Sequence, residues 1–537
     1  MFNGKEIPHK EPIPHWTKAV VVILLLILSF QCVMSLRQKS PTWDETHYLG
    51  IGKYLLTHFT WDTLGSILHP PLTFFLHDIP LLFFPTPEIM PLGDQQSRFW
   101  LGAADLKKGN RILMSDRYNG ETLFFLSRLF MIPLSIILGV FVFLWAKDLY
   151  STRAGLLALF LYCFSPNILA HARLITPDLS LACFSFLSIY FYWKFTLVEK
   201  KPRYLFFSAL SFGLALVSKY SALLLFPIFM VIFIINAIVD FYSPSSHSFK
   251  AMKKDILNLL LLFCLGAILI LVFYGFNLSP YFDGIVFQLK KSKWGHAAFL
   301  DGSISWEGWW YFFIYAFLLK TPIPTLVFII IALILRDHLK SLFKKKEFFL
   351  IIPIVSYIIF FSYSRQCVGL RYILPIYPFI FVFVSRILNM WIKPRKVVMG
   401  LVIGLSVWYL IGTIRIYPHY LAYFNECVGG PSNGYKYLVD SNLDWGQDLK
   451  LLKRYMDAQG IKEIYLDYFG SVDPAFYNIS YKKIDGNTSL FPKGWYAVSA
   501  TKLQGVYSQA RECSYDKLKK KKPVAQIGYS IFVYFIY

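Results

Sequence analysis

Two adjacent carboxylates, Asp44 and Glu45, follow Pro41-Thr42 and precede His47 close to the amino terminus of the chain. An aspartate with an ordinary pKa is ionised at neutral pH, so it can accept the proton of a hydroxyl as that hydroxyl forms a new bond. Carboxylates are also favoured in the first turn of a helix by the helix dipole. The sequence leaves both interpretations open, a general base or a helix start.

Further polar groups recur beside apolar runs. His69 precedes two prolines that restrict the backbone where a helix would begin. Arg173 is a candidate substrate-binding residue in the next such loop. It is followed by Thr176-Pro177-Asp178, which could serve as a helix start, with Thr176 as cap and Pro177 as first residue, and in which Asp178 adds a second carboxylate.

Several cations have the same placement. Lys219 either snorkels to the interface or holds a phosphate as a point charge. His296 is followed by Asp301 and Glu307 among tryptophans typical of an interfacial belt. Arg365 and Arg371 lie at a hairpin, where arginines are suited to clamp a phosphate or diphosphate.

The elements that must position these groups are membrane helices. The 537 residues have a mean hydropathy of +0.48, with 56% hydrophobic and 16% charged residues. Repeated apolar runs of about 18 residues or more indicate a polytopic membrane protein. The net charge of +22 comes from short clusters between these runs. That pattern sets topology and can contact anionic membrane lipids, so we expect no nucleic-acid partner.

Eleven spans are predicted after a cytoplasmic segment 1–18, and the first is a retained anchor rather than a signal peptide. A long external excursion, 37–120, separates the first two spans, and its apolar stretch 72–84 is too short to cross. With this count the basic clusters fall mainly on the cytoplasmic side. The predicted spans are 19–36, 121–146, 154–171, 177–195, 204–219, 221–239, 256–275, 309–335, 348–364, 370–389 and 397–415.

The remaining segment, 417–537, is polar and reads as a small external α/β domain beyond a transmembrane domain that covers 19–416. A helix is expected near 448–458, and strands near 463–469, 495–500 and 526–537. Cys427 and Cys513 both lie here, so a disulfide is possible. The seven cysteines show no metal-binding spacing.

With this topology the carboxylates, histidines and candidate phosphate-binding cations share the external side, which suggests a lipid-linked phosphate substrate. A transporter or flippase of lipid-linked sugars is the alternative, although such proteins place ionisable groups at mid-membrane. A structural subunit with a partner-binding domain is a third, and it leaves the acids unexplained.

The ordered motifs resemble the GT-C membrane glycosyltransferases, over nearly the whole chain. The likeness is to a bacterial branch of the dolichyl-phosphate-mannose protein mannosyltransferase-like family, with the lipid A aminoarabinose transferases as relatives. The stretches that carry it are 44–45, 69–72, 174–178, 295–296, 308–311, 318–322, 369–378, 429–434 and 440–448.

This resemblance implies a GT-C fold and an inverting transfer of a sugar from a polyprenyl-phosphate donor to a protein or glycolipid acceptor. The transfer would take place outside the cytoplasm, at a bacterial inner membrane. Asp44 matches the general base and Asp178 the second acidic position, and Glu45 would support the loop or a metal. His69, Lys219, His296 and Arg371 would contact phosphate, sugar or metal. Some members use a divalent ion, so the resemblance leaves the cofactor open.

Overall fold

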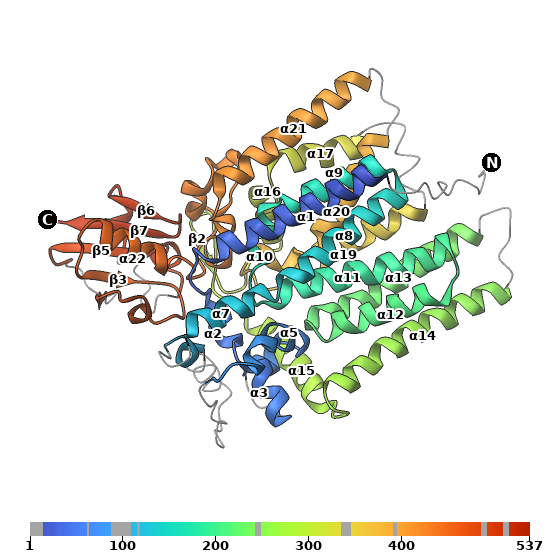
Figure 1. Cartoon of the computed structure of the whole chain (residues 1–537), viewed down its shortest axis with the longest axis horizontal. Helices are drawn as coiled ribbons and strands as arrows, with labels where there is room; N and C mark the ends of the chain where they lie inside the picture. Colours follow the sequence, from blue (N-terminus) through green and yellow to red (C-terminus); the bar gives the residue numbers. More distant parts are fainter. Residues whose placement is uncertain are drawn as a thin grey trace.

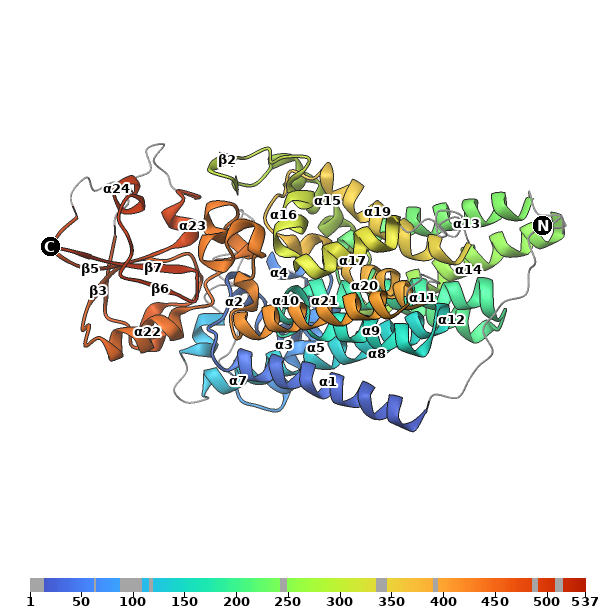
Figure 2. The same ribbon diagram turned by 90° about the horizontal axis from the view of Figure 1, so that it is seen from above.

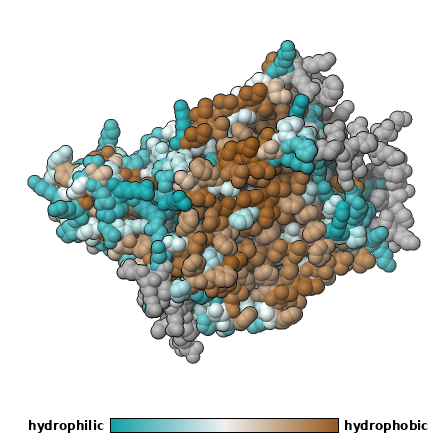
Figure 3. Space-filling view, in the orientation of Figure 1, coloured by the Kyte–Doolittle hydropathy of each residue, from teal (hydrophilic) through white to brown (hydrophobic). Residues whose placement is uncertain are grey.

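The computed structural model describes residues 14–61, 64–86, 109–114, 119–241, 249–334, 345–389, 395–484, 491–507 and 515–537. Long helices run side by side, and a small sheet domain lies beyond one end of them, as Figures 1 and 2 show. In Figure 3 hydrophobic residues dominate the surface over the helices, while the domain and the opposite end are largely hydrophilic. This surface is that of a multi-pass membrane protein.

The helices follow the predicted apolar runs. They are α1 (His15–Leu36), α7 (Gly120–Leu129), α8 (Ile132–Leu149), α9 (Thr152–Cys163), α10 (Pro166–His171), α11 (Pro177–Trp193), α12 (Pro202–Leu216), α13 (Leu225–Phe241), α14 (Phe249–Phe273), α16 (Phe312–Lys320), α17 (Ile323–Ile334), α19 (Lys345–Ser362), α20 (Ile376–Ser385) and α21 (Arg395–Ile416).

Within the described residues, six helices are long and apolar enough to cross a membrane, and a bent pair would make seven. Three other predicted spans correspond to shorter helices, and the fourth, 348–364, corresponds to α19, which has 18 residues but carries Lys345, Lys346 and Glu347. The count of eleven therefore stays a prediction. The bent pair is α16 and α17, which meet at 111° where one span was expected. The cause is Thr321-Pro322, since a residue before proline avoids the helical region and Thr321 is extended (φ −90°, ψ 131°).

Short helices cover the end of the bundle that faces the sheet domain: α2 (Trp43–Tyr48), α3 (Ile51–His58), α4 (Leu64–Leu68), α5 (Leu72–Asp78) and α15 (Ser279–Trp294). α5 continues as a 3-10 turn, Ile79–Leu82, and packs against α3. The stretch 72–84 is therefore helical over Leu72–Leu82, too short to span, as expected.

The carboxyl-terminal sheet has the order β4 (Tyr481–Lys483), β3 (Ile464–Asp467), β5 (Gly494–Ser499), β7 (Ile531–Ile536) and β6 (Ala525–Ile527). β4, β3 and β5 are parallel, while β7 runs antiparallel to β5 and β6. The helix α22 (Leu449–Ala458) confirms the expected one. The expected strand 526–537 is instead a hairpin, because Gly528 and Tyr529 have positive φ and reverse the chain.

A lysine at the end of α16 fixes the segment that connects the bundle to this domain. Lys320 is buried, and its Nζ donates to the carbonyl oxygens of Leu421 and Tyr423 at 2.9 Å each, and also to that of Asn442. All three ammonium donors are thereby used on the connecting segment. Cys427 in this segment is exposed, and Cys513 lies outside the described residues.

Candidate active site

A cavity of about 1390 Å³ lies between the bundle and the sheet domain. One arm is apolar and runs among η4 (Tyr220–Leu224), α13, α15 and α19, where it is lined by Leu224, Pro227, Leu289, Ile359 and Phe360. The other arm is polar and is lined by the sheet domain, including Asp440, Asp467, Lys483, Lys502 and Tyr507. Asp44 and Arg371 line the cavity as well, so the same cavity has both apolar walls and charged groups.

Carboxylates and cations alternate here. Arg371 donates from Nη1 to Asp44 Oδ2 at 2.6 Å, and the same nitrogen lies 3.8 Å from Asp178 Oδ2. Lys219 Nζ lies 2.5 Å from Asp178 Oδ1. The Arg371 guanidinium lies over the indole ring of Trp445, with its central carbon Cζ 4.2 Å from the ring centroid. Residues more than 300 positions apart in sequence therefore form one charged cluster. This agrees with the prediction that they lie on the same side of the membrane.

Asp44 is held in the first turn of α2 with 19% of its side chain exposed. Burial alone raises the pKa of this carboxyl, but the charge and hydrogen bond of Arg371 outweigh burial and leave the pKa below its usual value. Asp44 is therefore ionised at neutral pH, with one oxygen facing the cavity cation.

Glu45 has a different environment. Its side chain is fully buried, and it accepts hydrogen bonds from Arg128 Nε at 2.8 Å, Ile175 N at 3.2 Å and Thr42 N at 2.8 Å. With Thr42 it forms the capping box of α2. Glu45 thus fits the loop-supporting role, and it does not line the cavity.

Two histidines line the cavity. His69 lies edge-on to Tyr48, and burial, followed by the charge of Lys219, lowers its pKa to about 3, so it is neutral at physiological pH. His296 Nδ1 lies 3.2 Å from the hydroxyl of Tyr507, which donates to Asp440 Oδ2 at 2.5 Å.

Two expected substrate-binding residues do not line this cavity. Arg173 is buried, with Nη1 3.4 Å from the carbonyl of Ser35, and Arg365 is exposed near the carbonyl of Lys293. Reasoning from sequence gave no role to Lys291, Asp440, Trp445 and Tyr507, which do line it. For Asp440 and Trp445 a signal existed, since both lie in the motif 440–448.

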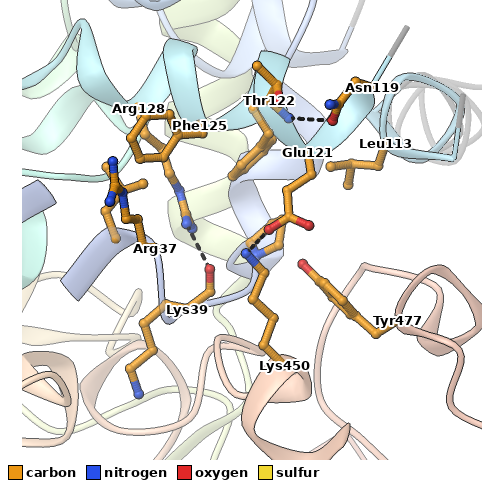
Figure 4. Close-up of a pocket in the computed structure, with 13 residues that line it drawn as sticks. Arg37, Lys39, Leu113, Asn119, Glu121, Thr122, Phe125, Arg128, Lys450 and Tyr477 are labelled. Atoms are coloured by element: carbon orange, nitrogen blue, oxygen red, sulfur yellow. Dashed lines mark hydrogen bonds and ion pairs between the residues drawn. The ribbon is translucent and has the colours of Figure 1, made fainter. Parts of the chain in front are cut away.

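A second pocket, of about 300 Å³, lies between the segment that follows α1, the helix α7 and the sheet domain (Figure 4). Its polar groups pair with one another: Glu121 binds Lys450, and Arg128 Nη1 donates to the Lys39 carbonyl at 3.2 Å. The Lys39 ammonium points away and binds Asp448 and His419. The Glu121–Lys450 pair at this pocket thus joins α7 to the sheet domain.

Over the described residues, no group of three or more His, Cys, Asp or Glu side chains has a geometry that could hold an ion.

Comparison with known proteins gives a family match over part of the chain. Residues 119–272 match the model of the dolichyl-phosphate-mannose-protein mannosyltransferase family. A search of curated proteins finds no sequence relative.

Solved structures give a match over nearly the whole chain. ArnT from Cupriavidus metallidurans in the apo state superposes with a TM-score of 0.51 at 10% identity, covering 96% of this chain and 97% of that one. The same protein bound to undecaprenyl phosphate gives 0.52 at 12% identity, with the same coverage. The protein O-mannosyltransferase Pmt1-Pmt2 complex of S. cerevisiae, bound to the sugar donor, matches over 50% of this chain and 35% of that one (TM-score 0.36, 15% identity). The two ArnT comparisons establish a shared fold.

Proposed function

We propose that the chain is a membrane glycosyltransferase of the GT-C type, and that it transfers a sugar from a polyprenyl-phosphate donor to an acceptor hydroxyl, with Asp44 as general base. The acceptor is a protein or a glycolipid outside the cytoplasm. The proposed location is a bacterial inner membrane, with the cavity on the periplasmic side. A related fold in ArnT binds undecaprenyl phosphate, which supports a carrier of this class.

The observation that carries this proposal is the continuity of the cavity from apolar helix faces to the charged cluster. A polyprenyl tail must stay in the bilayer while its phosphate reaches the interface. The arm lined by Leu224, Leu289 and Phe360 suits the tail.

The cations that line the same cavity suit the phosphate. Arg371 presents a planar fork, which is favourable for phosphate oxygens, while Lys219 and Lys291 act as point charges. Asp178 pairs with Lys219 and faces Arg371, so it holds both cations in place before the donor binds.

The reaction then follows from the position of Asp44. The acceptor oxygen attacks the anomeric carbon and forms the new glycosidic bond, while its proton passes to the Asp44 carboxylate. The bond from that carbon to the phosphate oxygen breaks on the opposite face, and polyprenyl phosphate leaves with its charge balanced by Arg371. Attack opposite the leaving group inverts the anomeric centre.

The test uses purified full-length protein with a panel of polyprenyl-phosphate sugars and measures transferred sugar and donor binding separately. Asp44→Asn should lower transfer by about 100-fold or more and leave donor binding largely intact. Asp283→Asn is the matched control, because Asp283 is an exposed acid on α15 outside the cavity lining.

Undiminished transfer by Asp44→Asn would sink the assignment of the base. Movement of donor across vesicles without any transfer would instead favour the flippase.

A further inference from the structure

We propose that the carboxyl-terminal end of α15, together with the segment that follows α19, binds the head group of an anionic phospholipid. The phosphate of this lipid contacts Lys290, Lys293 and Arg365. The lipid belongs to the membrane leaflet on the side of the sheet domain, and it lies outside the cavity. The site is therefore separate from the proposed reaction and does not depend on it.

The depth of α15 in the membrane is the first argument. Figure 1 shows this helix at the end of the bundle that faces the sheet domain. The preceding stretch Met252–Phe273, in α14, is long and apolar enough to cross a membrane, and α15 begins after the short turn 274–278. Positive φ at Gly275 and Phe276 reverses the chain in this turn. A helix that begins so close to the end of a span lies at the level of the lipid head groups.

The outer face of α15 has the residue pattern of an interfacial helix. Phe282, Val286 and Leu289 are all exposed, and their spacing of four and three positions puts them on one stripe. Lys290 and Lys293 are exposed beside this stripe, near the end of the helix. The apolar side chains can therefore contact acyl chains while the two ammonium groups reach a phosphate.

The neighbouring Lys291 points in another direction. Lys291 lines the cavity, whereas Lys290 and Lys293 do not. Adjacent residues of a helix point about 100° apart, so α15 separates the cavity cation from the two outer lysines. The outer pair is thus left for a lipid of the surrounding bilayer.

Arg365 adds a third cation to the outer pair. Its Nη1 donates to the carbonyl oxygen of Lys293 at 3.4 Å, and Gln366 Nε2 donates to that of Lys291 at 2.8 Å. These hydrogen bonds fix the segment after α19 to the end of α15. The guanidinium keeps its other N–H donors, and its planar fork is suited to phosphate oxygens. Arg365 thereby acquires a role, although it does not line the cavity.

The charges near this group leave an excess of cations. None of the three makes an ion pair with a residue that the structure describes. One exposed acid, Glu307, lies in the same region, because the preceding Trp306 accepts a hydrogen bond from the His296 amide at 3.1 Å. Three cations therefore have one acid close to them.

Two further exposed acids lie elsewhere. Asp283 is on α15, about two turns before Lys290, and it accepts a hydrogen bond from the Ser279 hydroxyl at 3.3 Å. Asp301 is at the tip of the hairpin formed by β1 (Ala298–Leu300) and β2 (Ser303–Ser305), at the opposite end from Trp306. Neither acid neutralises the group, so an anionic ligand is favoured.

Exposed tryptophans favour a lipid over other anions. Trp294, Trp306 and Trp310 are 68%, 64% and 69% exposed, and tryptophans concentrate at the level of the lipid head groups. A free phosphate or an acidic peptide would use the cations but would leave these rings and the apolar stripe of α15 without a partner. A phospholipid satisfies both kinds of side chain.

The test is photo-crosslinking in the purified full-length protein, reconstituted in vesicles of equal phosphatidylglycerol and phosphatidylcholine. Trp294→p-benzoylphenylalanine captures the lipid beside this exposed position, and mass spectrometry identifies that lipid. We expect phosphatidylglycerol to be captured at least about fivefold more often than phosphatidylcholine, because one cation close to an anionic lipid surface favours binding by roughly that factor.

The variant Lys290→Gln/Lys293→Gln/Arg365→Gln should reduce the capture ratio to that of the vesicle. Its matched control is Lys520→Gln/Lys521→Gln/Lys522→Gln, which removes the same charge from exposed positions of the sheet domain. The control should keep the full preference for phosphatidylglycerol.

Capture at the vesicle ratio with the three cations intact, an unchanged preference without them, or an equal loss in the control would each overturn the inference. Undecaprenyl phosphate, added as a minor component, should not displace phosphatidylglycerol from this position. If it is captured preferentially, the face belongs to the donor and the inference is wrong.

Discussion

Asp44 and Glu45 are neighbours in sequence, and each pairs with an arginine, but they lie in opposite environments. The Asp44–Arg371 pair borders an open cavity, and both side chains remain partly exposed. The Glu45–Arg128 pair is closed: Glu45 is fully buried and bonded to three elements of the chain. α2 thus has a chemical face and a structural face. An acid is available for catalysis when some of its acceptor positions point into a space that a substrate can enter.

The largest expected effect comes from neutralising Glu45. Glu45→Gln leaves Arg128 buried without a counter-charge, so it should lower the free energy of unfolding by about 3–5 kcal/mol. Asp44→Asn should cost only about 1 kcal/mol, because Arg371 keeps Asp178 nearby. Thermal unfolding in one detergent measures both.

If Glu45→Gln does not accumulate, Glu45→Gln/Arg128→Gln should recover part of the loss, since no single charge is then left buried. Equal destabilisation by the Asp44 and Glu45 substitutions would contradict the distinction between the two faces.

Removing the cavity arginine should change the pH profile. Arg371 holds the pKa of Asp44 down against burial, so in Arg371→Gln that pKa rises and Asp44 is protonated at higher pH. The acid limb of single-turnover transfer, measured at saturating donor, should move up by roughly one to three pH units.

Arg371→Lys keeps the positive charge and should retain most of the wild-type profile. An acid limb that stays in place in Arg371→Gln would mean that Asp44 is not the group that titrates.

A smaller effect is expected where the sheet domain holds α2. Ser471 Oγ donates to the Trp43 carbonyl at 2.8 Å, and Thr46 Oγ1 donates to Ser471 Oγ at 2.6 Å. Ser471→Ala removes hydrogen bonds of about 0.5–1.5 kcal/mol each, so the turnover rate should fall a few-fold with donor affinity unchanged. Ser480→Ala, at an exposed serine of the same domain, should leave both values at wild type. A changed donor affinity with normal turnover would contradict a positioning role.

The sequence predicts the helices well because each apolar run is a local signal. It also groups Asp44, Asp178, Lys219 and Arg371 correctly, because span parity places them on one side. It does not separate Asp44 from Glu45, although Thr42 and Glu45 have the spacing of a capping box. The burial of Glu45 against Arg128 and Ile175 depends on distant chain segments, and no local pattern contains it.

The polar arm is harder to predict for the same reason. Lys483 and Lys502 look like surface lysines, and only the order and direction of β4, β3 and β5 bring them to one edge. Tyr507 is identified by its contacts to Asp440 and His296, more than 60 and 200 positions away.

Lys320 has a consequence for which acceptors can react. The Lys320 ammonium binds three carbonyl groups of the connecting segment and so fixes that segment to the end of α16. The sheet domain that follows is therefore held at a fixed distance from the helices. If Asp44 is the base, as proposed, the fixed position of the domain predicts selection by depth: a hydroxyl presented at the depth of Asp44 should be glycosylated, and the same hydroxyl held nearer to the bilayer or farther from it should not react.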